Sequence, residues 1–217
     1  MGKEKQTILL RILAITLLLP FSAMAQSAPS GPMTLPTRDT HQNVSIVADP
    51  YISASRYGEQ FGKKSLYDAG IIAINVYFRN DNDAPIRLNL GTIDLTISLP
   101  GVARQQLDPL SPAEVADRTL LTADASPHLP RWPISFPGSV SGKSKAWNKM
   151  AAALQTVVLS TDILPPHATT HGFLFFDLNH DFDAIRHAHL YIPDLSFMTN
   201  HKALFFFDID LAAAQDK

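Results

Sequence analysis

The clearest pattern in the chain is an alternation of apolar and polar side chains between residues 71 and 99. In residues 71–78, Ile72, Ile74, Val76 and Phe78 alternate with smaller or more polar residues, and segments 86–90 and 93–99 alternate in the same way. Successive side chains of a strand point to opposite faces, so each segment predicts a half-buried strand. Three such strands in about thirty residues favour an antiparallel sheet, with the first two joined as a hairpin across the turn-forming residues 79–85.

Four more segments predict strands. Residues 44–48 alternate and are closed by Asp49 and Pro50, and residues 187–193 alternate as well. Residues 203–211 place Phe205 and Phe207 on the buried face, opposite the polar Asp208 and its neighbours. Residues 173–178 are apolar on both faces, which is typical of a central strand that is covered from both sides.

Two short helices are predicted between the strands. Ser111, Pro112 and Glu114 form a capping box with proline at the first helical position, which indicates a helix to about residue 121. Apolar residues recur at helical spacing over residues 144–155. Residues 51–70 contain several glycines and predict a long connection with one helical turn, whereas the proline-rich residues 123–142 predict an irregular crossing.

These elements predict a mainly β protein, an antiparallel immunoglobulin-like β-sandwich with two short helices in the crossings. The sandwich is expected over residues 44–213 as a single domain. Residues 26–43 contain three prolines among Ser, Gly and Thr without an apolar period, so a flexible linker is expected there.

The strand and turn motifs also carry a resemblance. The segment from Gly70 through Arg79 and Asn80 to Leu88, together with the later run Gly172-Phe-Leu-Phe-Phe176, resembles uncharacterised exported bacterial proteins with an immunoglobulin-like β-sandwich domain. The resemblance covers about two-thirds of the chain after residue 25. It implies a fold and a location, and it implies no catalytic residues.

The N-terminal residues 1–25 have the three parts of a cleavable signal peptide. Lys3, Lys5 and Arg11 precede and border an apolar run over residues 12–19, and Ala23-Met24-Ala25 has the small residues of a cleavage site. The apolar stretch is shorter than the roughly 20 residues of a spanning helix. The sequence therefore predicts a periplasmic or secreted protein with no membrane span after signal cleavage.

Composition narrows the functions further. The 217 residues are 46% apolar and 18% charged, with 18 basic residues against 20 acidic ones and a net charge of −2. This balance disfavours disorder and a nucleic-acid footprint. The chain contains no cysteine, so disulfides, thiol catalysis and thiolate metal sites are excluded.

Histidines near the C-terminus form the first candidate for chemistry. His187 and His189 are spaced to lie on one face of a strand, where they could bind zinc or copper if His180, His171 or Asp177 supplied a third ligand. A surface role without metal is the preferred interpretation, because the sequence fixes only two ligands.

Two loop motifs are weaker candidates. Asp177, Asn179 and Asp181 match the first ligand positions of a calcium loop, but Phe182 replaces the turn glycine and Ala188 replaces the closing glutamate. Residues 138–144 resemble a phosphate-binding loop but have three residues between the glycines instead of four. We therefore expect polar loops in both places.

The sequence thus assigns no catalytic, cofactor-binding or metal-binding residue, and we expect no cofactor and no enzyme activity. The leading hypothesis is an exported noncatalytic binding or structural module of the cell envelope, with an unknown envelope protein or extracellular ligand as partner. One alternative is a metal-binding envelope protein that uses the histidine cluster. Another is a hydrolase whose site has no recognisable motif.

Overall fold

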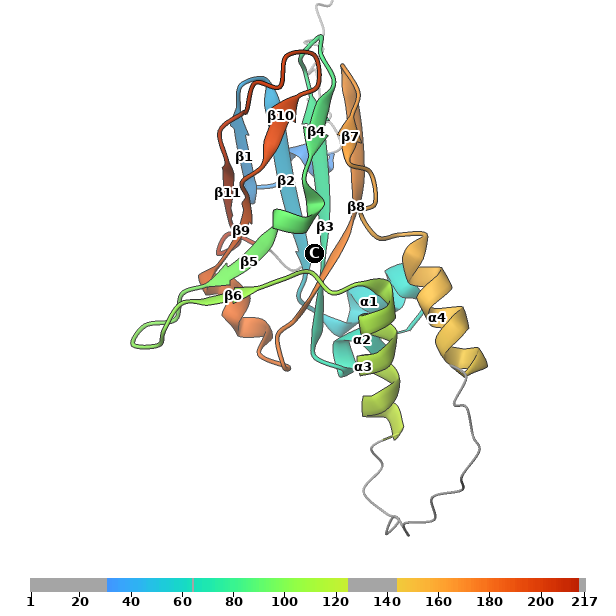
Figure 1. The fold of residues 1–217 in the computed structure, drawn as a ribbon. Coiled ribbons are helices and arrows are strands. Elements are labelled where there is room, and N and C mark those ends of the chain that lie inside the picture. Colours follow the sequence, from blue (N-terminus) through green and yellow to red (C-terminus); the bar gives the residue numbers. More distant parts are fainter. Residues whose placement is uncertain (1–30, 64, 125–143, 215–217) are drawn as a thin grey trace, which may run out of the picture.

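The computed structural model describes residues 31–63, 65–124 and 144–214, with strands in three antiparallel sheets (Figure 1). Sheet A has the order β1 (Arg38–His41), β2 (Val44–Tyr51), β3 (Ile71–Asn80) and β8 (Ala168–Asp177). Sheet B has the order β10 (Leu195–Phe197), β4 (Ile86–Leu88) and β7 (Ile163–Leu164). Sheet C has the order β11 (Phe207–Asp210), β9 (Ala188–Ile192), β5 (Asp94–Ile97) and β6 (Gln105–Leu107). The mainly β, antiparallel part of the prediction is therefore confirmed.

The main core lies between sheet A and sheets B and C. On β3 the predicted face is correct, because Ile72, Ile74, Val76 and Phe78 are all fully buried in this core. The opposite layer contributes apolar side chains from β4, β5, β9 and β11: Ile86, Leu95, Leu190 and Ile209. Alternation along each strand thus supplies one layer of the core, as the period of two requires.

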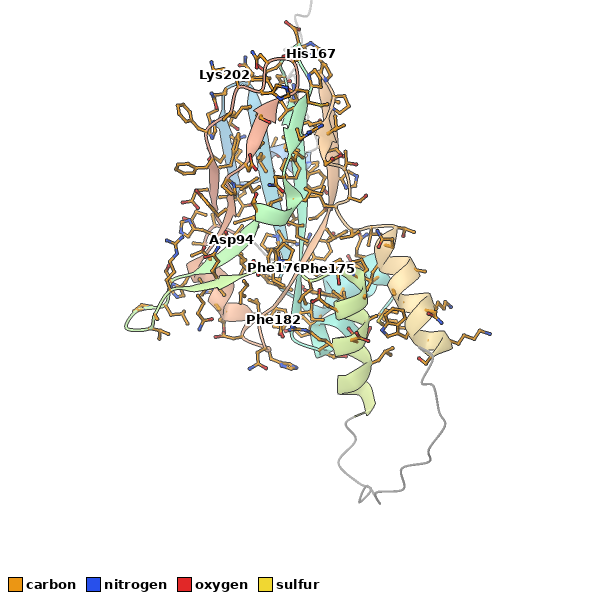
Figure 2. The ribbon with its side chains drawn as sticks, viewed as in Figure 1. Asp94, His167, Phe175, Phe176, Phe182 and Lys202 are labelled. Carbon is orange, nitrogen blue, oxygen red and sulfur yellow. The ribbon has the colours of Figure 1, made fainter. Side chains whose placement is uncertain are left out.

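A second core lies on the other side of sheet A, where helices cover the lower part of β3 and β8 (Figure 1). The helices are α1 (Ala54–Phe61), α2 (Ser65–Asp68), α3 (Pro112–Asp124) and α4 (Lys145–Gln155). On β8, Phe175 belongs to this second core and Phe176 to the main core, and both side chains are fully buried (Figure 2). The predicted coverage from both sides is therefore confirmed, but β8 is the last strand of sheet A, so the prediction of a central position was wrong.

The two predicted helices form with the predicted caps. The Ser111 amide donates to Glu114 Oε2 at 2.8 Å and the Glu114 amide donates to Ser111 Oγ at 3.3 Å. Ser144 caps α4 by accepting from the Trp147 amide at 3.1 Å. These bonds satisfy backbone N–H groups that the first turn of a helix leaves unpaired.

Residues 51–70 contain more helix than the single turn that was predicted, because both α1 and α2 form there. Tyr57 of α1 explains the stability of this region. Its hydroxyl donates to the Ile71 carbonyl at 3.0 Å and accepts from the Ala73 amide at 2.9 Å, so it satisfies β3 just where β2 ends. The tertiary contact outweighs the weak helix propensity of Gly58.

The linker prediction for residues 26–43 was wrong over its described part. A 3-10 turn, η1 (Pro32–Thr34), and strand β1 occupy residues 31–43, and β1 pairs with β2.

The prediction that the first strand ends at Asp49 and Pro50 was also wrong. The Ala48 amide donates to Thr37 on the β1 side, so the Pro50 nitrogen faces the same side beyond the end of β1, where no ladder bond is lost.

The predicted hairpin between residues 71–78 and 86–90 does not form. β3 belongs to sheet A, whereas β4 pairs with β10 and β7 in sheet B. The fully buried Asn80 holds this crossing, since its amide donates to the carbonyls of Ala84 and Pro165 and its oxygen accepts from Asn82. Alternation alone cannot distinguish the two pairings, because either one buries the same face.

The last predicted strand is shorter than expected. β11 begins at Phe207, and Phe205 and Phe206 are 70% and 54% exposed, so the prediction of Phe205 as a core residue was wrong. Side chains from β1 and from the turn between β1 and β2 hydrogen-bond the backbone of this segment instead. Gln42 accepts from the Phe205 amide at 2.7 Å, and Asp39 accepts from the Asp208 amide at 3.3 Å. The remaining elements are η2 (Leu90–Thr92) and η3 (Phe182–His187).

Candidate functional site

The candidate site is the outer face of sheet A, which we define as the side of β1, β2, β3 and β8 that is turned away from sheets B and C. Strand register arranges its side chains in rows across the sheet. One row contains Arg38, Val47, Tyr77 and His171, and the next contains Thr40, Ser45, Arg79 and Thr169. Two further rows, which begin at Asp49 and Tyr51, lie toward the helices.

An ion pair marks the boundary between the helices and the open part of this face. Both guanidinium ends of Arg56 on α1 bind Asp49, with NH2 to Oδ2 at 2.8 Å and NH1 to Oδ1 at 3.1 Å. The guanidinium carbon lies 3.8 Å from the ring centre of Tyr51. Both charged side chains are largely buried, at 11% and 15% exposure. This bidentate, stacked geometry is the one that arginine favours over lysine.

Asn75 lies beside this ion pair and leaves one polar atom unsatisfied. Its side-chain amide donates to the Tyr77 hydroxyl at 2.9 Å. Its carbonyl oxygen is buried and has no hydrogen-bond partner among the described residues. Burial raises the pKa values of the neighbouring Tyr51 and Tyr77, so both hydroxyls keep their protons at neutral pH. Asn75 therefore holds the Tyr77 hydroxyl at the edge of the helix-covered half of this face.

Beyond Asn75 the exposed side chains of the outer face are polar, although Val47 of β2 is fully buried among them. The Tyr77 and His171 rings stack with centroids 5.1 Å apart, and Thr169 and Arg79 are exposed. A cleft of about 440 Å³ lies at the β1 side of this region, with Arg38, Thr40, Ser45 and Arg79 among its lining residues. The sequence analysis missed these residues, because polar positions on an alternating strand are also expected on any solvated face.

The structure separates the histidines and the proposed third ligands. His187 ends η3 and His189 lies on β9, where its Nδ1 is 3.1 Å from Asp208 Oδ1. His171 lies on the outer face of sheet A, and His180 contacts the Asp68 carbonyl at 3.1 Å. Within the described part of the chain, no group of three His, Asp or Glu residues is arranged to hold a metal ion.

The residues of the calcium-like loop have structural partners. Asp177 forms an ion pair with Arg118 of α3 and accepts from the Asn179 amide at 2.9 Å. Asp181 caps η3 through the Ala184 amide, and Phe182 stacks on Tyr67 with centroids 4.3 Å apart. The phosphate-loop-like residues 138–143 lie outside the described residues, as do the predicted signal peptide and most of the predicted crossing at 123–142.

Two further clefts lie in other parts of the described structure. The one on sheet B has a volume of about 390 Å³ and contains Arg87, Asp162, Asp194 and Ser196 in its lining. A smaller one of about 130 Å³ lies between β6 and the end of β8 and includes Asp177 and Asp181. Neither lining includes a histidine, so neither pairs a hydroxyl nucleophile with an imidazole base.

Comparisons with known proteins do not identify the chain: no family model, no curated protein and no solved structure matches it. Among the described residues, no helix combines the length and the apolar character that crossing a membrane requires.

Proposed function

We propose that the protein is an exported, noncatalytic module of the cell envelope, with an immunoglobulin-like β-sandwich, that binds a hydrophilic ligand on the outer face of sheet A. One observation carries the proposal. Helices cover one half of this face, whereas the exposed side chains of the other half are polar and include Arg38, Arg79 and His171.

The chemistry of the open half supports binding rather than catalysis. The hydroxyls of Thr40 and Ser45 hydrogen-bond each other at 3.1 Å. In the described structure neither hydroxyl is bonded to a histidine or a carboxylate that could activate it as a nucleophile. The open half is suited to many weak polar contacts with an extended ligand, because its hydroxyl, amide, imidazole and guanidinium groups are spread over several strands.

Introduced cysteines provide the test. Because the chain contains no cysteine, Thr169→Cys places one reactive thiol on the open half of the outer face, and Gln106→Cys places one on β6 of sheet C. Thr169 is exposed, so its variant should not perturb folding, whereas Gln106 donates to the buried Asp94 at 2.8 Å, so Gln106→Cys should lower stability by about 1–3 kcal/mol and still leave the protein folded. We expect purified cell-envelope polysaccharide or peptidoglycan to slow alkylation of Thr169→Cys at least fivefold and to leave Gln106→Cys unchanged.

A second substitution links this protection to the site. The exposed His171 lies in the neighbouring row of β8, and His171→Ala should abolish the protection of Thr169→Cys while preserving the melting temperature. Equal alkylation rates at both thiols with every envelope fraction, or protection of Gln106→Cys alone, would contradict the proposal.

A further inference from the structure

The open half of the outer face carries two arginines although the protein is acidic overall, with a net charge of −2. Arg38 lies on β1 and Arg79 on β3, and both side chains are exposed. The single strand β2 separates them, and they are displaced by one row along the sheet. Strand spacing and rise place their Cα atoms roughly 12 Å apart.

Most donors of these two arginines remain available to a ligand. Arg79 uses its Nε to donate to Asp81 at 2.8 Å, and Arg38 makes one long bond of 3.4 Å to the Met33 carbonyl. A guanidinium carries five N–H donors, so each arginine retains several. In the described structure, Arg38 has no carboxylate within ion-pair distance.

The acidic residues of the cleft do not cancel this donor capacity. Asp39 accepts from the Asp208 amide and lies 3.8 Å from His41, so its carboxylate is engaged toward β11. Asp81 is engaged with Arg79, and its side chain is 43% exposed, which weakens its attraction for the guanidinium through solvent screening. The cleft of about 440 Å³ between the arginines therefore remains suited to an anionic group.

The donors and acceptors continue beyond the cleft across the sheet. Thr40 and Ser45 lie inside it, Thr169 follows on β8, and the Tyr77–His171 pair and Asn75 lie in the next rows. Four strands span roughly 14 Å, which is longer than one carboxylate or one sugar ring. The separation of the arginines places them over different units of such a ligand.

We propose that this face binds an acidic polysaccharide. This proposal rests on the proposed function and adds the class of ligand. Arg38 and Arg79 hold carboxylates of different sugar units, and the polar side chains between them bind sugar hydroxyls.

Two other polyanions fit the face less well. A lipid surface requires apolar side chains beside the cationic ones, but the exposed large apolar residues of the described structure, Val102, Phe205 and Phe206, lie outside this face. A nucleic acid requires many phosphate contacts, and the rows of this face carry only two arginines and no lysine.

Titration with polygalacturonate, a carboxylate polymer, tests the inference, with neutral dextran and phosphatidylglycerol vesicles as comparison ligands. We expect polygalacturonate to bind at low salt and to weaken as salt rises, whereas dextran does not bind. Arg38→Gln and Arg79→Gln should each reduce the affinity roughly tenfold or more. The matched control is Arg87→Gln, because Arg87 is an exposed arginine on β4 of sheet B, and it should change the affinity less than twofold.

Three outcomes would overturn the inference: no binding of polygalacturonate, equal affinity of the Arg38→Gln/Arg79→Gln variant, or binding to the vesicles alone. Protection of Thr169→Cys by envelope material distinguishes this failure from failure of the proposed function. If protection persists without polygalacturonate binding, the face binds a different ligand. If protection is also absent, both proposals fail.

Discussion

Replacing Phe175 by alanine tests whether the helical layer is an integral part of the fold. Phe175 is fully buried against the helices, and its neighbour Phe176 is fully buried between the sheets. Both side chains are on β8, so the two cores share one strand. We therefore expect them to unfold together, in a single transition.

The magnitude follows from burial. Truncation of a buried phenylalanine costs about 3–5 kcal/mol, because transfer free energy is lost and a cavity remains. For a domain of this size that loss lowers the melting temperature by roughly 6–20 °C. Phe175→Ala should match Phe176→Ala within about 1 kcal/mol, since the two side chains are equally buried. The control Phe206→Ala, at a side chain that is 54% exposed, should change stability by less than about 0.5 kcal/mol.

Urea denaturation followed by far-UV circular dichroism and by tryptophan fluorescence measures this loss. Trp147 on α4 donates its indole N–H to Asp117 of α3 at 2.7 Å, so its environment depends on the helical layer, and Trp132→Phe removes the signal of the second tryptophan. A loss below about 1 kcal/mol for Phe175→Ala alone, or a separate early transition seen only by fluorescence, would refute the reasoning. Either result would mean that the helices dock on a sheet domain that is stable without them.

Four further predictions concern other parts of the molecule. The backbone amide of Ser111, and then its hydroxyl, hold the pKa of Glu114 below its ordinary value. The stability that Glu114 adds over Glu114→Gln should therefore be present at neutral pH and be lost as pH falls through the lowered pKa. Urea titrations at several pH values measure this difference, and a difference that persisted at the lowest pH would contradict the prediction. Arg56→Met should cost about 3 kcal/mol in chemical denaturation, because Asp49 is left largely buried without its counterion, and the second substitution Asp49→Leu should recover part of this loss. The melting temperature should not respond to zinc, copper or a chelator, and the His187→Ala/His189→Ala variant should melt like the wild type; a metal-dependent rise that the double variant abolishes would favour the metal-binding alternative. Mass spectrometry of the protein recovered from the native host should find Gln26 at the N-terminus, and an intact Met1 in the membrane fraction would contradict signal cleavage.

The sequence predicts elements better than it predicts their pairing. Period-two alternation located β3, β5 and β9, and the serine caps located the starts of α3 and α4. The failures occurred where tertiary contacts decide. β1 and β6 are almost entirely polar, and β7 and β10 are only two and three residues long, so none of them shows a period, and they exist because a neighbouring strand offers backbone partners.

The error over the hairpin has a specific cause. A turn rich in Asn and Asp serves equally well for a hairpin and for a crossing between two sheets. The buried side chain of Asn80 decides between them here, because it bonds the carbonyls of Leu164 and Pro165, which lie more than eighty residues away in the sequence. Those partners cannot be read from the local pattern.

The same reasoning explains why the candidate site was not predicted. Arg38, Tyr77 and His171 share one row only because β1, β2, β3 and β8 pair in a fixed register, and the first and last of these residues are far apart in the chain. Taken singly, each is a polar residue on a strand, which a solvated face also explains. Asn75 is different, because its side chain is buried beside an ion pair and holds the Tyr77 hydroxyl. Asn75→Leu should therefore weaken ligand binding, because it removes the 2.9 Å hydrogen bond that holds the Tyr77 hydroxyl on this face.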